Sequence, residues 1–532
     1  MKTENIKRFL SLPVVTIGII LLAIAVRIVL QIHFLDLDND KSYQIQASKN
    51  LLLGHGVSLL QVYAENLFTP TYVPLTMWPP GYSFILSPFL LICKNNYVLA
   101  TIIVDILTCI LFILYSRKIL QRLKFQQWII NIYIIFIGFF QYSFCSDSST
   151  DFLTLTLFLI ATERFLKIVV HPHFSFKLII CFIFFLFLCV SLRYQYIPVI
   201  FCPSLLLIIL GKKERNSLFL KNGVYVFVGT AILIITLLFY QYQINGEAVF
   251  IPRGEVNFSL NNIKVLHPFL FSAFLNMDFL SIQMMKMTGY SYETVLTIIF
   301  VIHFLALLFI SFIAIRYIIL HGYNTSSLLK KYILLCVSVS TITLLLLLVF
   351  SLGYTTISNN KVGIWTYVQE GRYFALPIFF LQQFFLLYII KNFRRIFIPL
   401  IFLILLSFSH DIYYTAKIIT KRGGLVKNPN SIRIIDYTAK FIKDIKEEYP
   451  ENNIVVVSQP VFVGSQAGFY DTVPALYRFM PLSNTVFEIN NNLIVIIITD
   501  NPESVPSFNV PTFTVKKGAF NGYIYSAVKI AR

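Results

Sequence analysis

Charged residues are scarce in this chain of 532 residues: Asp, Glu, Lys and Arg together make up 13% of it, against roughly 25% in a soluble domain. Hydrophobic residues make up 57%, and the mean hydropathy is +0.74. This composition excludes an intrinsically disordered chain, a coiled coil and a nucleic-acid-binding protein as the main class. The sequence therefore predicts an integral membrane protein with many spans.

The chain also lacks the cysteine spacing of a zinc site or a disulfide framework. Its seven cysteines lie within or at the ends of apolar segments, so we expect them to act as small apolar packing residues. The tail after residue 414 has no cysteine, which excludes disulfides there. Its glycine stretch GSQAG, at 464–468, lacks the spacing of a phosphate-binding loop.

What the chain has instead is about eleven apolar segments, since a helix needs about 20 apolar residues to cross a bilayer. They lie at 11–32, 97–115, 127–144, 152–169, 175–192, 195–211, 223–241, 294–315, 332–352, 373–390 and 396–413. The first follows Lys2, Lys7 and Arg8 and is not followed by a small-residue cleavage site, which is typical of a retained signal anchor.

Lysines and arginines gather in every second loop between these segments. The residues are Arg117, Lys118, Arg122 and Lys124, then Lys212, Lys213 and Arg215, then Arg316, Lys330 and Lys331, and finally Lys391, Arg394 and Arg395. The positive-inside rule makes these loops and the N-terminus cytoplasmic. Much of the net charge of +18 is then explained by topology. An odd number of spans places the C-terminus outside.

Three outer stretches are longer than simple loops: 33–96, 242–293 and the tail. We predict a transmembrane domain over 1–413 that includes the first two, and a small extracytoplasmic α/β domain over 414–532.

The tail pattern supports a separate α/β domain. Apolar residues recur at helical spacing over 431–449, and 452–458 and 493–499 are short apolar runs typical of buried strands. Residues 523–530 alternate like a further strand.

The densest polar cluster, DLDNDKSYQIQASKNLLLGHG at 36–56, follows the first span. It brings Asp36, Asp38 and Asp40 to the outer membrane face, followed by a short interfacial helix that ends at Gly54. The next motif, WPPGYSFILSPFLLI at 78–92, is too short to span the bilayer and is expected in the interface or packed into the protein. The alternative is an ordinary hydrophilic loop with a Pro-Pro turn.

Two further clusters lie at outer ends of spans. CSDSSTDFLTL contains Asp147 and Asp151, which are candidates for a second carboxylate site; the alternative is helix capping by Ser149 and Asp151. Arg193, in SLRYQYIP, occupies a tight turn between two spans; the alternative is an arginine that snorkels to the interface.

A fourth cluster, YVQEGRYFALP, places Glu370, Arg372 and Tyr373 where an outer loop enters a span. The planar guanidinium of Arg372 suits a phosphate, and the alternative is a local pair with Glu370. Arg27, inside the first span, is expected to be a packed or snorkelling residue. Carboxylates and arginines thus converge on one membrane face, which favours an enzyme acting on a lipid-anchored substrate.

Several motifs, in this order, resemble the GT-C superfamily of membrane glycosyltransferases. They are the acidic cluster, Tyr43 with Ala47, LLLGHG and WPPGYS. The nearest branch is the bacterial one related to protein mannosyltransferases and to the aminoarabinose transferase of lipid A. Thr150-Asp151 resembles the second acidic site of that group, and SLRYQ and EGRYFALP resemble its later arginine motifs. The resemblance covers residues 1–413.

The chain departs from the family pattern at the acidic pair. Where the family often has acidic residues four and three positions before the tyrosine, this chain has Asn39 and Asp40, with Asp38 one step earlier. The catalytic carboxylate is therefore Asp40 or Asp38, and we favour Asp40.

The resemblance implies an inverting hexosyl- or pentosyltransferase in the bacterial inner membrane. It would move a sugar from a polyprenyl phosphate to a lipid, glycan or protein acceptor on the extracytoplasmic face. Asp40 or Asp38 would act as general base, with Asp151 as the second acidic residue. Arg372, Arg193 and Tyr373 would bind the donor phosphate, and Glu370 would orient Arg372. Whether a Mg²⁺ or Mn²⁺ ion bridges Asp40 and Asp151 stays open.

Two other functions remain as alternatives. One is a surface-polysaccharide polymerase or ligase with a diphosphate-linked donor, which a large arginine-rich outer loop would favour. The other is a flippase or transporter for a lipid-linked sugar, which would usually carry polar groups at mid-membrane and repeat symmetry. Membrane lipids are expected partners in every case, and nucleic acid in none.

Overall fold

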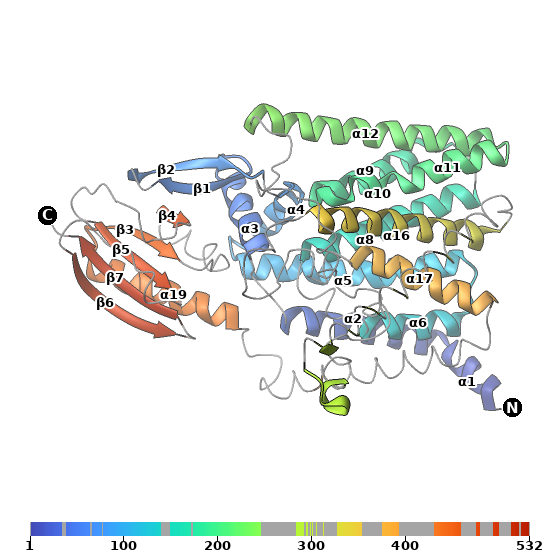
Figure 1. Cartoon of the computed structure of the whole chain (residues 1–532), viewed down its shortest axis with the longest axis horizontal. Coiled ribbons are helices and arrows are strands. Elements are labelled where there is room, and N and C mark those ends of the chain that lie inside the picture. The colour runs from blue at the N-terminus through green and yellow to red at the C-terminus, as the bar shows by residue number, and fades with distance from the viewer. Residues whose placement is uncertain are drawn as a thin grey trace. The chain divides into compact units, whose positions relative to one another are not determined.

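The computed structural model shows a mostly helical chain with a small region of β-structure (Figure 1). It describes residues 2–33, 39–63, 66–76, 78–139, 149–171, 174–245, 284–291, 327–353, 375–392, 430–458, 475–478, 493–499, 512–520 and 523–530, with isolated residues between 294 and 316 and at 416.

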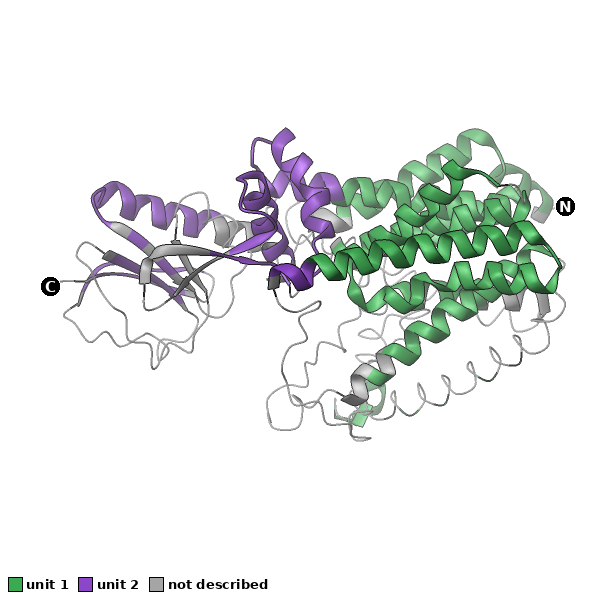
Figure 2. Cartoon of the chain, turned by 90° about the horizontal axis from the view of Figure 1, so that it is seen from above, with its two compact units in different colours: residues 1–32, 105–240, 251–425 green, residues 33–104, 241–250, 426–532 purple. Residues whose placement is uncertain are grey.

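The chain divides into two compact units, coloured separately in Figure 2. Unit 1 contains residues 1–32, 105–240 and 251–425, and unit 2 contains residues 33–104, 241–250 and 426–532. Unit 2 thus groups the first outer stretch with the tail. The domain boundary expected at residues 413/414 stays a prediction.

Unit 1 is a bundle of apolar helices. Its described helices are α1 (Lys2–Leu10), α2 (Pro13–His33), α5 (Tyr97–Arg122), α6 (Gln127–Phe139), α8 (Ser149–Val170), α9 (Phe176–Leu192), α10 (Ile197–Ile200), α11 (Cys202–Lys213), α12 (Ser217–Asn245), α16 (Leu328–Gly353) and α17 (Ala375–Asn392), with a short 3₁₀ turn at Tyr194–Tyr196. The first residues of α5 and the end of α12 belong to unit 2. Nine of the eleven expected apolar segments coincide with described helices; the segments 294–315 and 396–413 lie almost entirely outside the described residues.

Four of the described helices are long and apolar enough to cross a membrane: Tyr97–Arg122, Tyr194–Lys213, Ser217–Ile244 and Leu328–Leu346. The bent pair Glu4–Leu10 and Pro13–Val29 raises the number to five if it forms one span. The structure therefore supports a helical membrane protein, and eleven spans are not shown. The described parts of α6, α9 and α17 are shorter apolar helices, and α8 carries four charged side chains.

Helix α8 lies at the centre of unit 1, since every residue from 150 to 163 is buried. Aromatic rings pack around it from two other helices. Phe152 meets Phe112 of α5 with ring centroids 5.0 Å apart, and Phe158 meets Phe380 of α17 at 5.3 Å. A helix that is buried on all sides is apolar on all sides, as a membrane span is. This explains why the hydropathy of the sequence predicted the helix.

Unit 2 contains two short helices, a hairpin and a sheet with one helix. Its elements are α3 (Asn39–Leu52), β1 (Ser58–Tyr63), β2 (Asn66–Pro74), α4 (Gly81–Ile92), α19 (Asn430–Glu448), β3 (Asn453–Ser458), β4 (Ala475–Arg478), β5 (Leu493–Thr499), β6 (Thr512–Phe520) and β7 (Tyr523–Ile530). The helix expected over 431–449 and the strands expected at 452–458, 493–499 and 523–530 are confirmed. The sequence analysis missed β4, β6 and the β1–β2 hairpin.

The five-stranded sheet has the order β4-β3-β5-β7-β6. Strands β4, β3 and β5 are parallel, whereas β7 runs antiparallel to β5 and β6. Helix α19 covers one face, where Phe441, Ile442 and Ile445 join a core with Ile496 and Tyr525. The burial of both faces of β5 explains its unbroken apolar run, because a strand covered on both sides has no polar face.

At the surface of this sheet, Lys516 Nζ donates to Asp444 Oδ2 at 2.9 Å. This hydrogen bond lowers the pKa of the Asp444 carboxyl from its ordinary value. The edge strand β4 also lies against both strands of the β1–β2 hairpin. The first outer stretch and the tail therefore meet within unit 2.

The packing of α11 against α12 depends on the absence of a side chain at Gly211. A Cβ there would lie 2.5 Å from the backbone nitrogen of Leu220, whereas a Cβ at Gly18 of α2 would meet nothing within 4 Å. We expect Gly211→Ala to lower the thermal unfolding midpoint in nanodiscs, because backbone atoms must move apart. Gly18→Ala is the matched control and should leave the midpoint unchanged or raise it, since alanine favours helix. Equal midpoints for the two variants would contradict the close approach.

Candidate functional site

The structure describes the side chains of two of the seven predicted site residues, Asp151 and Arg193. Asp40 is the second residue of α3 in unit 2, and its side chain is not described. Asp38, Glu370, Arg372 and Tyr373 lie outside the described residues. Their predicted roles therefore stay predictions.

Asp151 and Arg193 form a buried ion pair in unit 1. Arg193 Nη2 donates to Asp151 Oδ2 at 2.8 Å, with 0% of the Asp151 side chain and 7% of the Arg193 side chain exposed. Asp151 lies in the first turn of α8, where the helix dipole favours a negative charge. The two residues are 42 positions apart in sequence, and the sequence analysis assigned them to different roles without foreseeing the pair.

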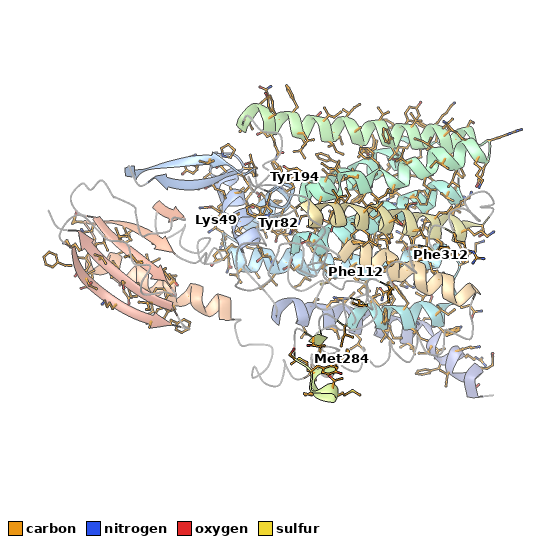
Figure 3. The ribbon with its side chains drawn as sticks, in the orientation of Figure 1. Lys49, Tyr82, Phe112, Tyr194, Met284 and Phe312 are labelled. Atoms are coloured by element: carbon orange, nitrogen blue, oxygen red, sulfur yellow. The ribbon has the colours of Figure 1, made fainter. Side chains whose placement is uncertain are left out.

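The local chain turn explains how Arg193 reaches Asp151. Helix α9 ends at Leu192, and Arg193 has an extended backbone, with φ −151° and ψ 111°. A 3₁₀ turn follows, and α10 then begins at Ile197. Pro198 is its second residue, where the fixed φ of proline suits the first helical turn. Figure 3 labels Tyr194 at this turn, at the end of the unit 1 bundle away from α1.

The pair is buried beside further polar side chains. Asp151 Oδ1 has no hydrogen-bond partner among the described residues. Tyr196 is fully buried, and its hydroxyl is close enough to Asp151 and Arg193 for their charges to act on it. From α9, Cys189 Sγ lies 3.6 Å from the Thr154 carbonyl oxygen. A buried carboxylate oxygen without a partner is costly, which is typical of a position that meets a ligand.

Arg27 lies buried among helices α2, α5, α6 and α8. Its Nε donates to the carbonyl oxygen of Ile137 at 3.0 Å, and its guanidinium carbon lies 5.6 Å and 5.8 Å from the ring centroids of Phe112 and Phe152. Ile137 is in the last turn of α6, where carbonyl groups lack helical partners. The expectation that Arg27 is a packed residue is confirmed, and it fixes Phe152, the neighbour of Asp151.

In unit 2, the two motifs that carry most of the family resemblance pack against each other. The Tyr43 ring lies 4.9 Å from the Trp78 ring, and the two residues share a small core with Ala47. Gln44 Nε2 donates to the Pro79 carbonyl oxygen at 3.1 Å, and Ser83 Oγ donates to Gln44 Oε1 at 2.7 Å. Figure 3 shows Lys49 of α3 and Tyr82 of α4 in this part of unit 2.

The sequence analysis overlooked how deeply α3 is buried. All residues from 43 to 50 are buried, including the polar Gln44, Gln46, Ser48 and Asn50. Gln46 Nε2 has no hydrogen-bond partner among the described residues. The low hydropathy of this segment pointed to the interface. The WPPGYS motif was the signal in the sequence that could have predicted this burial. It begins a short apolar helix that cannot span the bilayer and needs another element to pack against.

The described residues around Asp151 include no metal-binding group. Arg193 already neutralises its carboxylate, and the described part of the chain has no group of three His, Cys, Asp or Glu side chains that could hold an ion. The expected bridge between Asp151 and Asp40 involves a side chain outside the described ones and stays a prediction.

No protein-family model, no curated protein and no solved structure matches this chain. The likeness to the GT-C superfamily thus rests on the short motifs alone.

The Asp151–Arg193 pair can be tested by a double-mutant cycle. We expect Asp151→Asn and Arg193→Gln each to lower the unfolding free energy by about 3–5 kcal/mol, because each leaves a buried charge without its partner. The double variant should lose clearly less than the sum, measured by denaturant unfolding in bicelles. Additive losses would show that the two side chains do not interact.

Proposed function

We propose that this protein is an extracytoplasmic glycosyltransferase of the GT-C type in the bacterial inner membrane. It moves a sugar from a polyprenyl phosphate to a lipid, glycan or protein acceptor. The observation that carries the proposal is the buried Asp151–Arg193 pair in the bundle of apolar helices, with one carboxylate oxygen lacking a partner among the described residues. Ionisable groups buried in a membrane bundle usually serve a function.

The chemistry needs a base for the acceptor and a cation for the leaving group. In the proposal, Asp40 or Asp38 takes the proton of the acceptor hydroxyl as it attacks the anomeric carbon. The bond from that carbon to the phosphate oxygen breaks, and polyprenyl phosphate leaves with the charge that arginines stabilise. Arg372 and Tyr373 are the proposed phosphate ligands from the later motif.

The Asp151–Arg193 geometry supports a refined role for both residues. A guanidinium has five N–H donors in a rigid fork, so one arginine can serve a carboxylate and a phosphate together. Asp151 would hold Arg193 in the orientation that the phosphate needs, rather than bind a metal. This makes Asp151 a positioning residue in the proposal.

The packing of α3 on α4 supports a defined place for the proposed base. Asp40 begins α3, and the contacts of Gln44 with Pro79 and Ser83 fix this helix on the WPPGYS segment. A base must stay within hydrogen-bond reach of its proton donor, and a helix held by buried hydrogen bonds provides that constraint.

The proposal predicts turnover of a polyprenyl-phosphate sugar by the purified full chain in nanodiscs. Release of polyprenyl phosphate would be followed for a panel of donors, with cell-envelope extract as the acceptor. We expect release from at least one donor, reduced about 100-fold or more by Asp40→Asn or Asp38→Asn, the loss expected on removing a general base. Arg193→Lys keeps the charge but loses the fork, and should lower turnover with the same donor.

Asp444→Asn is the matched control, since it removes a surface carboxylate from helix α19 in the tail. Turnover by this variant should equal that of the unaltered chain. No release from any monophosphate donor, with release from a diphosphate-linked one, would favour the polymerase or ligase. Movement of a lipid-linked sugar between leaflets without any glycosyl product would overturn the proposal in favour of transport.

A further inference from the structure

A second charged cluster lies at the opposite end of α8, on a carboxylate that the proposed reaction does not use. Glu163 is fully buried, and Arg122 from the end of α5 donates from Nε to its Oε1 at 2.7 Å. Arg164 Nη1 lies 3.2 Å from Oε2, and Lys167 Nζ lies 4.0 Å from Oε1. Glu163 therefore gathers three cations at one point.

The positive charge in this cluster exceeds what Glu163 neutralises. Lys118 lies one helical turn before Arg122, and Lys118, Arg122 and Arg164 are all close enough to Lys167 for their charges to act on it. Three cations thus meet one carboxylate, and a fourth, Lys118, lies near Lys167. The C-terminal ends of α5 and α8 add a partial negative charge, about half an elementary charge each. A net charge of about +2 remains for an anion to balance.

The exposure of the side chains shows on which side that anion would lie. Glu163 is 0% exposed, whereas Arg164, Arg122 and Lys167 are 18%, 22% and 34% exposed. Lys118 is exposed as well. The carboxylate is thus inside the protein, and the cationic side chains are partly exposed at its surface. Arg164 Nε is buried and has no hydrogen-bond partner among the described residues. The guanidinium of Arg164 therefore has one N–H group that no described residue binds.

The cluster lies at the end of the bundle that also carries the N-terminal helix. Arg122 is joined to α6 by a short turn, and Asn131, near the start of α6, donates to the Leu10 carbonyl oxygen at the end of α1. Asp151 and Glu163 are 12 positions apart on α8, or about 18 Å along the axis. Exposed apolar side chains such as Leu114 and Val170 lie close to the basic ones in sequence. Basic groups beside an apolar helix surface meet lipid headgroups.

We propose that Lys118, Arg122, Arg164 and Lys167 bind the phosphate of an anionic phospholipid, with Glu163 as the residue that holds the arginines in place. Guanidinium forks recognise phosphate oxygens in pairs. The site is distinct from the Asp151–Arg193 pair and does not depend on the proposed glycosyl transfer.

The test is retention of phosphatidylglycerol by the full chain, measured by native mass spectrometry after release from nanodiscs of phosphatidylcholine with added phosphatidylglycerol. We expect phosphatidylglycerol to be retained in preference to phosphatidylcholine. Lys118→Gln should weaken retention about fivefold, as expected for one basic residue near a membrane surface. Lys118 makes no ion pair with Glu163 among the described contacts, so this variant leaves the buried cluster intact.

Lys212→Gln is the matched control, because Lys212 is also an exposed lysine near the end of a helix and belongs to a loop assigned to the same membrane face. Its retention of phosphatidylglycerol should be unchanged. Equal losses for both variants, or no preference for phosphatidylglycerol, would overturn the site. Inorganic phosphate should fail to displace the lipid; displacement at millimolar concentration would overturn a lipid site in favour of a free anion.

Discussion

Buried charge must be compensated, and in unit 1 this constraint acts at both ends of one helix. Helix α8 is buried from residue 150 to residue 163, and it carries a carboxylate near its start and another near its end. Asp151 is met by Arg193 and Glu163 by Arg122. Removing Arg193 would leave the Asp151 carboxylate without its ion-pair partner in a low-dielectric interior. Removing Arg122 would leave Glu163 with Arg164 and Lys167 of its own helix. The turn after α9 therefore lies beside the start of α8, and the C-terminal end of α5 lies beside Glu163.

The same constraint separates two kinds of charge in the sequence. The lysines and arginines of the basic loops were interpreted as a sign of topology, which any membrane protein shows. The structure adds that one of them, Arg122, pairs with a buried acid, Glu163, which Arg164 of α8 also meets. Arg193 and Arg27 belong to another kind, because each is buried and bound to a specific oxygen, of Asp151 and of Ile137.

Much of the helical framework could be predicted from hydropathy alone. The apolar segments at 152–169 and 175–192 match α8 and α9, and the tail runs at 452–458 and 493–499 match two strands. For α8 and β5 the reason is burial on all sides, which leaves an unbroken apolar pattern. The sequence analysis did not predict the burial of segments whose side chains are polar. Helix α3 is polar yet buried, since Gln44 and Ser83 satisfy each other across two helices. No local pattern reveals a partner 39 positions away.

The candidate site was predicted as separate residues, and its pairing was missed for a similar reason. Asp151 and Arg193 are both visible as charges at the ends of apolar segments, but whether they meet depends on the packing of α8 on α9. Strands β4 and β6 and the β1–β2 hairpin were missed because their alternation is weak. Asp40, Asp38 and Arg372 remain candidates on the strength of their motifs.

The two ion pairs of α8 also limit how the bundle can move. They lie about 18 Å apart on one rigid helix and join it to two different neighbours. A sliding step of one helical turn, about 5.4 Å, would break both of these interhelical pairs at once, although Glu163 would keep Arg164 and Lys167 of its own helix. Helix α8 is thus locked against piston motion along its axis. Any rearrangement of the bundle therefore has to come from helices that tilt or swing around it.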